Sequence, residues 1–128
     1  MGEKIGKKRI LLIDDELIIT RTMQTFLEGT GQFEVRAENH AAKALKAARE
    51  FKPHLILLDV VMPEFDGGQV AELIRADELL KAVPIVFLTS LVSRGEVRES
   101  GGDIGGFPFI AKPIDPKAVM KVIESVLG

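Results

Sequence analysis

Residues 55–59 read Leu-Ile-Leu-Leu-Asp, a continuously apolar run that ends on a carboxylate. A parallel strand that is covered by helices on both faces has this pattern, because neither face meets water. Four other apolar runs, rich in Ile, Leu, Val and Phe, span residues 9–13, 33–37, 85–88 and 107–111. The sequence therefore predicts five β-strands, several of them buried on both faces.

Segments with apolar residues at helical spacing separate most of these strands, and the predicted helices begin near residues 17, 41, 66 and 115. Asn39 is expected to cap the second helix, which covers residues 41–50. Strands that alternate with helices form an open parallel sheet with right-handed crossovers. The predicted fold class is therefore α/β, with a doubly wound sheet.

The segment from residue 92 to 106 breaks this alternation. It contains five glycines, and each interior glycine costs a helix about 1 kcal/mol relative to alanine. We therefore expect only a short helix near residues 94–99, followed by a mobile loop.

Composition bounds the class of protein. With 128 residues, 46% of them hydrophobic, the chain can bury one core, so we expect a single domain over residues 1–128 with its core at about 8–127. The absence of cysteine excludes disulfides and thiolate metal sites and favours a reducing compartment, hence the cytoplasm. A net charge of -2, and no apolar run near the roughly 20 residues of a membrane span, argue against nucleic acid or membrane as a partner.

Polar side chains follow the predicted strands at the points where they end; these are Asp14, Asp15, Asp59, Thr89, Ser90 and Lys112. In open α/β sheets, ligands bind outside the carboxyl ends of the strands. Three carboxylates in one pocket repel one another unless they share protons or hold a cation. Without His or Cys nearby, Mg²⁺ is the cation that fits best.

A carboxylate beside such a cation and a lysine can attack phosphorus. Asp59 would be the nucleophile, Lys112 and Thr89 would contact the phosphoryl oxygens, and small Ser90 would leave room for the group. A single aspartate at a strand end is more often a cap or a solvated residue, so the hypothesis depends on the whole set. His40 and His54 show no carboxylate partner in the sequence, so neither is predicted to be a catalytic base.

Four segments resemble the receiver domain of bacterial response regulators, and the resemblance extends over nearly the whole chain. They read Ile-Leu-Leu-Ile-Asp-Asp-Glu at 10–16, Leu-Leu-Asp-Val-Val-Met-Pro at 57–63, Phe-Leu-Thr-Ser at 87–90 and Phe-Ile-Ala-Lys-Pro at 109–113. The resemblance implies a flavodoxin-like fold, with five parallel strands in the order 2-1-3-4-5 and helices on both faces.

The resemblance also implies a role for each matching residue. Asp15 and Asp59 would bind Mg²⁺ directly, Asp14 mainly through water, and Val61 through its backbone carbonyl. Lys112 would contact the phosphoryl group.

Two further residues would form the switch that reports phosphorylation. Thr89 would move toward the phosphoryl group and Phe109 would turn inward, which would repack the face built from the fourth helix, the fifth strand and the fifth helix. Partners usually read the signal on that face. The Lys112–Pro113 peptide bond would be cis, which is tolerable only before proline.

Three departures from the family pattern matter. Pro108 falls inside the fifth strand, which is acceptable if that strand lies at an edge of the sheet where a lost donor can face solvent. The glycine-rich segment 95–106 replaces much of the usual fourth helix, so the output face of the family does not transfer to this chain. Val61 and Leu91 are apolar where polar side chains help rapid dephosphorylation, which predicts a long-lived phosphoryl group.

The implied function is a phosphorylation switch, with self-phosphorylation and self-dephosphorylation as its only chemistry. A histidine kinase or a phosphotransfer protein would supply the phosphoryl group. A downstream effector or a fused output domain would receive the signal, and phosphorylation could join two copies into a homodimer.

Two alternatives stay open. A degenerate receiver would bind partners without being phosphorylated. A phosphatase of the haloacid dehalogenase type would also use an Asp nucleophile, but it needs two aspartates two positions apart after the first strand and usually a cap domain. Asp14 and Asp15 are adjacent, so this second alternative is disfavoured.

Overall fold

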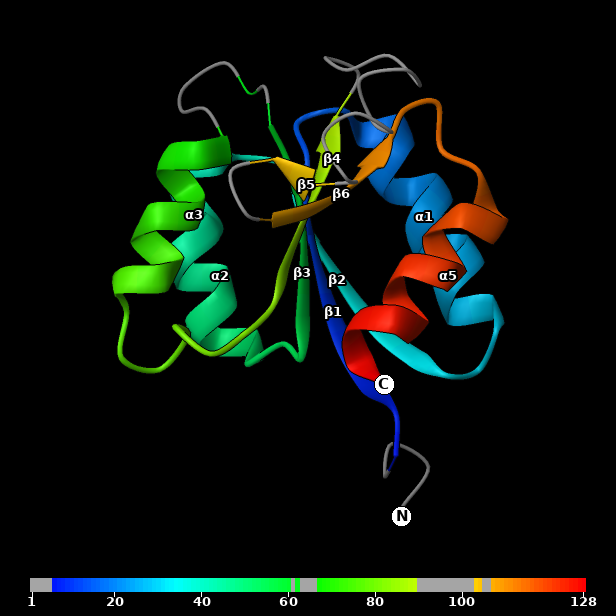
Figure 1. The fold of residues 1–128 in the computed structure, drawn as a ribbon, viewed down its shortest axis with the longest axis horizontal. Helices are drawn as coiled ribbons and strands as arrows, with labels where there is room; N and C mark the ends of the chain where they lie inside the picture. Colours follow the sequence, from blue (N-terminus) through cyan, green and yellow to red (C-terminus); the bar gives the residue numbers. More distant parts are fainter. Residues whose placement is uncertain (1–5, 61, 63–66, 90–102, 105–106) are drawn as a thin grey trace.

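The computed structural model describes residues 6–60, 62, 67–89, 103–104 and 107–128. Its elements in chain order are β1 (Lys8–Ile13), α1 (Leu17–Gly29), β2 (Phe33–Glu38), the 3₁₀ helix η1 (Ala41–Lys43), α2 (Ala44–Phe51), β3 (Leu55–Asp59), α3 (Gly67–Ala76), β4 (Ile85–Thr89), β5 (Asp103–Ile104), β6 (Phe107–Ala111) and α5 (Pro116–Leu127). The sheet lies between two layers of helices (Figure 1). The short helix predicted at 94–99 falls outside the described residues, as do Val61, Asp66, Ser90 and Leu91.

The strands are ordered β2-β1-β3-β4-β6-β5. The first five of these are parallel, so the predicted order 2-1-3-4-5 is confirmed, with β6 as the fifth parallel strand. The two-residue strand β5 was not predicted; it pairs with β6 in the antiparallel direction. No local pattern predicts this strand, because it is only two residues long and lies in the glycine-rich segment.

Because β5 lies outside β6, the expectation that Pro108 sits in the outermost strand is wrong. Lys112 N donates to Thr89 O in β4, and strand alternation directs the N atom of Pro108 to the same side. The described ladder between β4 and β6 begins with Phe87 and Phe109, one residue after Pro108. Pro108 therefore lies just before the residues paired with β4, so its missing N–H removes no hydrogen bond from the described ladder.

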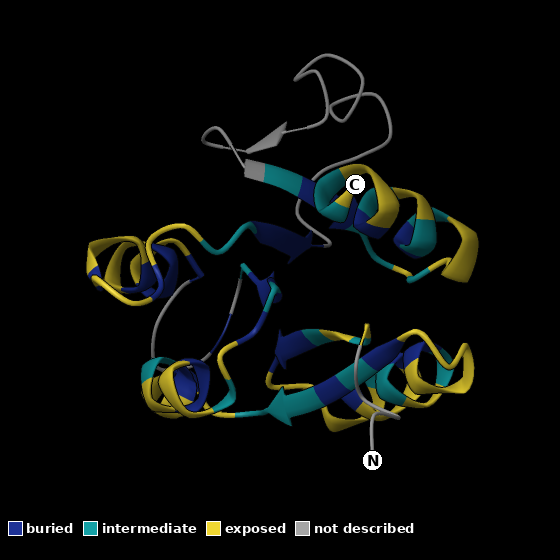
Figure 2. Ribbon diagram, turned by 90° about the horizontal axis from the view of Figure 1, so that it is seen from below, coloured by how far each residue is buried: buried dark blue, intermediate teal, exposed yellow. Residues whose placement is uncertain are grey.

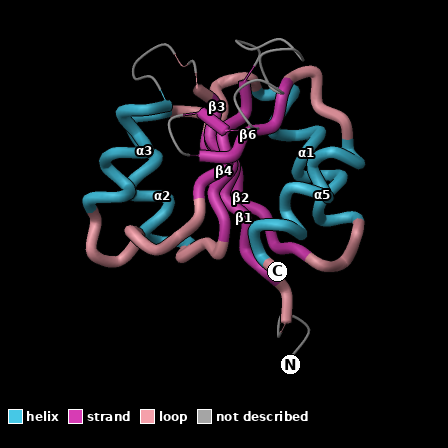
Figure 3. The backbone as a smooth tube through the Cα atoms, viewed as in Figure 1, coloured by secondary structure: helices cyan, strands magenta, loops and turns pink. Residues whose placement is uncertain are grey.

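Helices α1 and α5 cover one face of the sheet, and α2 and α3 cover the other (Figures 1 and 3). Alternate residues of β1 enter different cores. Ile10 and Leu12 pack among residues that include Met23 of α1 and Val119 of α5, whereas Leu11 and Ile13 pack among residues of α2 and α3. These four side chains are fully buried, and β3 and β4 are buried along their whole lengths, as the dark blue in Figure 2 shows. Burial on both faces explains why these strands read as continuous apolar runs.

The second helical segment differs from its prediction. It begins with η1 and continues as α2, and the residue that precedes η1 is His40, whose side chain makes no capping hydrogen bond. Asn39 does not cap it. Its amide group instead donates to Asp14 O at 2.8 Å and to Thr20 Oγ1 at 3.0 Å, because the end of β2 lies beside the loop that follows β1.

The last helix begins as expected. Asp115 caps α5, its side chain accepting a hydrogen bond from Lys117 N at 3.1 Å, with Pro116 in the first turn. The peptide bond between Lys112 and Pro113 is cis. Among the described helices, none has the length and apolar character needed to cross a membrane.

Candidate functional site

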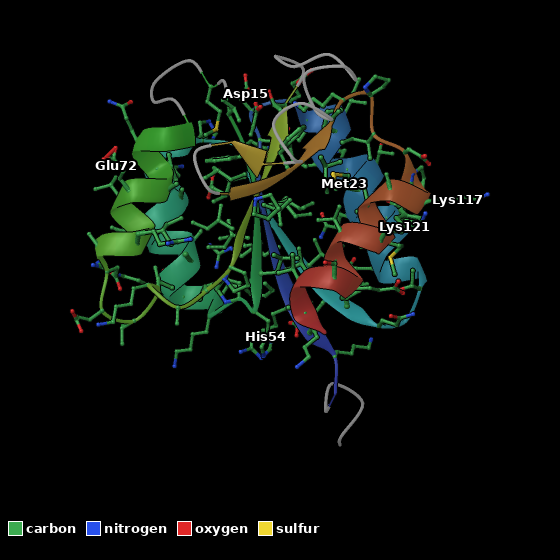
Figure 4. All side chains as sticks on the ribbon, viewed as in Figure 1. Asp15, Met23, His54, Glu72, Lys117 and Lys121 are labelled. Atoms are coloured by element: carbon green, nitrogen blue, oxygen red, sulfur yellow. The ribbon has the colours of Figure 1, made fainter. Side chains whose placement is uncertain are left out.

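The candidate site lies where the carboxyl ends of the parallel strands meet. Asp14 follows β1, Asp59 ends β3, Thr89 ends β4 and Lys112 follows β6. The register brings these ends together, because Ile13 pairs with Leu58, Asp59 with Leu88, and Thr89 with Ala111. Figure 4 shows the Asp15 side chain at this edge of the sheet.

The carboxylates of Asp14, Asp15 and Asp59 form one cluster. One oxygen of each lies within 4.8 Å of the others. Asp14 is fully buried and Asp59 is 4% exposed, whereas Asp15 is open to solvent. The cluster thus places two anionic groups out of water and a third at its mouth.

Asp14 is the most constrained member of the cluster. Its Oδ1 accepts a hydrogen bond from Glu16 N at 2.9 Å, and its own N–H donates to Glu38 O at 3.2 Å. Burial raises the pKa of Asp14, and the hydrogen bonds from Glu16 N and Lys112 offset this only in part. The charged carboxylate therefore lacks some of the stabilisation it would have in water.

Lys112 supplies the cationic group of the site. Its Nζ lies 2.8 Å from Glu16 Oε1, 2.9 Å from Asp14 Oδ2 and 3.5 Å from Asp59 Oδ1. Burial alone would lower the pKa of Lys112, but the hydrogen bonds to Glu16 and Asp14 and the charge of Asp59 outweigh it and raise the pKa. Lys112 is therefore a permanent cation at neutral pH.

A divalent cation fits this pocket. Asp14 Oδ2 is buried and forms an ion pair with Lys112 Nζ at 2.9 Å, and no other donor among the described residues hydrogen-bonds to it. A buried carboxylate oxygen with spare acceptor capacity, beside two further carboxylates, is the all-oxygen donor set that Mg²⁺ prefers. The residues present therefore match a hard cation.

The backbone around Asp59 is closely packed. Val60 N donates to Leu88 O at 3.1 Å, and Gly67 N donates to Val60 O at 2.6 Å, which ties the start of α3 to the end of β3. A Cβ atom on Gly67 would overlap the carbonyl oxygen of Asp59 and lie 2.8 Å from Val60 Cα. A residue without a side chain is needed at this position for Asp59 to keep its place.

Of the other residues predicted for the site, two are buried in the described structure and two lie outside it. Thr89 is 1% exposed at the end of β4, and Phe109 is 7% exposed and packs in the core cluster that contains Phe87. Val61 and Ser90 lie outside the described residues.

Sequence reasoning missed two residues that shape this site. Glu16, quoted only as part of a motif, pairs with Lys112, and Asn39, expected to cap a helix, binds the carbonyl of Asp14. A glutamate directly after two aspartates was the only signal for Glu16. The sequence around Asn39 does not show whether its side chain caps the following helix or binds the carbonyl of Asp14.

The histidines lie outside the carboxylate cluster. His54 Nδ1 accepts a hydrogen bond from Arg9 N at 2.9 Å, at the end of the sheet opposite Asp15 (Figure 4). Burial and the charges of Arg9 and Lys8 lower the pKa of His54. The expectation that neither histidine has a carboxylate partner is wrong for His40, whose Nδ1 is 3.5 Å from Glu38 Oε2; the two residues lie on either side of the turn at Asn39.

Comparison with known proteins shows which family has this sequence pattern and fold. A family model described as the response regulator receiver domain matches residues 10–124. The probable transcriptional regulator ycf27 of Pyropia yezoensis is 39% identical to 94% of this chain, and the match covers 48% of that relative. The chain spans about half the length of the first curated relatives it matches.

Solved structures share the fold over nearly all of the chain. The chemotaxis protein CheY4 of Vibrio cholerae superposes with a TM-score of 0.81 at 26% identity, covering 94% of this chain and 99% of that one. The receiver domain of the sensor histidine kinase PA1611 of Pseudomonas aeruginosa superposes with a TM-score of 0.79 at 25% identity, covering 95% of this chain and 98% of that one. That structure holds a magnesium ion coordinated in its active-site cleft.

Proposed function

This chain belongs to the response regulator receiver domain family, and from that premise we propose that Asp59 accepts a phosphoryl group with the help of Mg²⁺ and Lys112. A receiver domain is a signalling module and not an enzyme that turns over a substrate. The observation that carries the proposal is the convergence of three carboxylates and one lysine at the same end of the sheet.

The chemistry at Asp59 is a direct displacement. A carboxylate oxygen of Asp59 forms a bond to phosphorus while the bond from phosphorus to the leaving group breaks, and the leaving group departs with the electron pair. Negative charge spreads over the three equatorial oxygens during transfer. Lys112 Nζ, 3.5 Å from Asp59 Oδ1, is close enough to stabilise that charge, and the hydroxyl of Thr89 at the next strand end would donate to the same oxygens.

Asp14, Asp15 and Asp59 would hold the Mg²⁺ ion. Asp15 and Asp59 would bind it directly, Asp14 mainly through water, and the carbonyl of Val61, outside the described residues, would be a further ligand. When bound, the ion neutralises phosphoryl oxygens and lowers the repulsion between them and the carboxylates. Support comes from the buried Asp14 Oδ2, for which Lys112 is the one partner among the described residues, and from the magnesium ion in the related PA1611 receiver domain.

The partners follow from the family. The phosphoryl donor would be the phosphohistidine of a histidine kinase or a phosphotransfer protein. The signal would pass to an effector or to an attached output domain, as the longer relatives that include a probable transcriptional regulator suggest. A homodimer formed on phosphorylation and a cytoplasmic location are part of the same proposal.

Intact-mass measurement tests the proposal, and it suits this chain because the sequence has no Trp or Tyr for a fluorescence assay. The purified chain is incubated with acetyl phosphate and Mg²⁺, in parallel with an Asp59→Asn variant and a sample containing a chelator. We expect the mass of one phosphoryl group to be added to the parent only. No gain of mass in the parent would reject the proposal and favour a receiver that works without phosphorylation.

A further inference from the structure

Glu16 is the N-cap residue of α1, but its side chain contacts a residue from another part of the fold. It precedes α1 with an extended backbone, yet its side chain makes no capping hydrogen bond in the described part of the chain. The carboxylate instead crosses to Lys112, with Oε1 2.8 Å from Nζ, a contact between residues 96 positions apart. Glutamate is not among the residue types that usually cap helices, and the contact with Lys112 is what occupies its carboxylate in the described structure.

Lys112 is shared unequally among the carboxylates. Its contacts with Glu16 and Asp14 are short, at 2.8 and 2.9 Å, whereas its contact with Asp59 is 3.5 Å long. The ammonium group thus lies closer to Asp14 and Glu16, which follow β1, than to Asp59, the proposed phosphoryl acceptor. Closer approach to a phosphoryl group on Asp59 requires at least one short contact to lengthen.

Exposure indicates which of the two short contacts can open. The side chain of Asp14 is fully buried, while that of Glu16 is 58% exposed. A carboxylate that loses its partner inside the protein stays unsolvated, which is costly, whereas an exposed one regains water. Glu16 is therefore the partner that Lys112 can leave easily.

We propose that Glu16 is a positioning residue that holds Lys112 in the unphosphorylated domain and must release it when the phosphoryl group forms on Asp59. This inference rests on the proposed function of Asp59 and Lys112. A contact that is present in the ground state and lost in the transition state raises the barrier to the reaction. Glu16 accordingly slows phosphorylation, while the bonds made and broken stay the same: Asp59 oxygen to phosphorus forms, and phosphorus to the acetate oxygen of acetyl phosphate breaks.

The test compares phosphorylation rates by intact mass at sub-saturating acetyl phosphate with Mg²⁺. Glu16→Gln removes the charge at nearly constant size. Glu72→Gln is the matched control, because it changes net charge equally but lies on α3, on the other side of the sheet from α1 (Figures 1 and 4). We expect Glu16→Gln to be about two- to fivefold faster than the parent, as for the loss of one partly exposed ion pair, and Glu72→Gln to match the parent.

A second comparison separates release of Lys112 from a general change in charge near an anion site. Glu16→Gln is combined with Lys112→Gln, and the double variant is compared with Lys112→Gln alone over a long incubation. If Glu16 acts through Lys112, its substitution has no effect once Lys112 is absent. An equal acceleration in both backgrounds would overturn the inference, as would an unchanged or slower rate for Glu16→Gln in the presence of Lys112.

An NMR measurement tests the contact without any phosphorylation. The ¹⁵N–¹H correlation of the Lys112 ammonium, assigned by its loss in Lys112→Gln, should shift or broaden in Glu16→Gln and stay unchanged in Glu72→Gln. An unchanged signal in Glu16→Gln would contradict the inference. If the parent itself takes up no phosphoryl group, the proposed function fails instead, so the two failures are distinguishable.

Discussion

Lys112 Nζ lies 2.9 Å from Oδ2 of Asp14, a carboxylate that is fully buried at the end of β1. The contact does not compensate for the loss of water, because burial still raises the pKa of Asp14 above its ordinary value. The buried charge of Asp14 therefore destabilises the domain when no metal ion is bound, and a bound cation would offset this cost.

Stability should depend on pH through Asp14. In the unfolded chain this carboxyl titrates near 3.8, and in the folded chain it titrates higher. Its stabilising contribution is therefore fully present below pH 3.8 and is lost as the pH rises through the raised folded pKa. Asp14→Asn removes this dependence, so its free energy of unfolding should exceed that of the parent by about 1 kcal/mol at neutral pH.

Urea unfolding with a chelator present, at about pH 4, close to the unfolded pKa, and at about pH 8, checks this expectation. The advantage of Asp14→Asn should be larger at the higher pH. Asp15→Asn is the control and should gain less, because Asp15 is exposed. An Asp14→Asn variant that is less stable than the parent at the higher pH would contradict the account.

Gly67 should be intolerant of a side chain. Gly67→Ala places a Cβ against the carbonyl of Asp59 and the Cα of Val60, so we expect a loss of about 1–3 kcal/mol in the free energy of unfolding and slower phosphorylation. Gly29→Ala is the matched control, since a Cβ there meets no described atom within 4 Å. Equal stability of Gly67→Ala and the parent by chemical denaturation would show that the turn relaxes freely.

Phe109 should contribute mainly to the core of the unphosphorylated domain. It is 7% exposed and packs in the cluster with Phe87, so Phe109→Ala should cost about 3–5 kcal/mol in the free energy of unfolding. Leu79→Ala, at a side chain that is 77% exposed, should change stability by less than about 0.5 kcal/mol. Thermal or urea unfolding of the two variants decides this, and similar values for both would place Phe109 outside the core.

The phosphoryl group should be long-lived. The side chains of Val61 and Leu91 are apolar and cannot orient an attacking water, so we expect slow loss of phosphate once the donor is removed. Leu91→Gln should shorten the lifetime. A phosphate-affinity gel followed over time measures the decay, and loss from the parent within a few seconds would refute the prediction.

The sheet could be predicted because its signal is local. The run from Leu55 to Leu58 is apolar because both faces of β3 are covered, and each strand-end polar residue follows its own run. Asn39 and Glu16 could not be assigned in this way. Their partners, Asp14 with Thr20 and Lys112 respectively, come from other elements, so the contacts exist only once the chain has folded.

Locating the phosphoryl group tests the central claim most directly. Borohydride reduction converts an aspartyl phosphate to homoserine, and peptide mass spectrometry of the chain treated with acetyl phosphate and Mg²⁺ then identifies the modified position. We predict homoserine at position 59, and none when Mg²⁺ is removed. Homoserine at Asp14 or Asp15 instead, or at no position in a fully folded sample, would contradict the account.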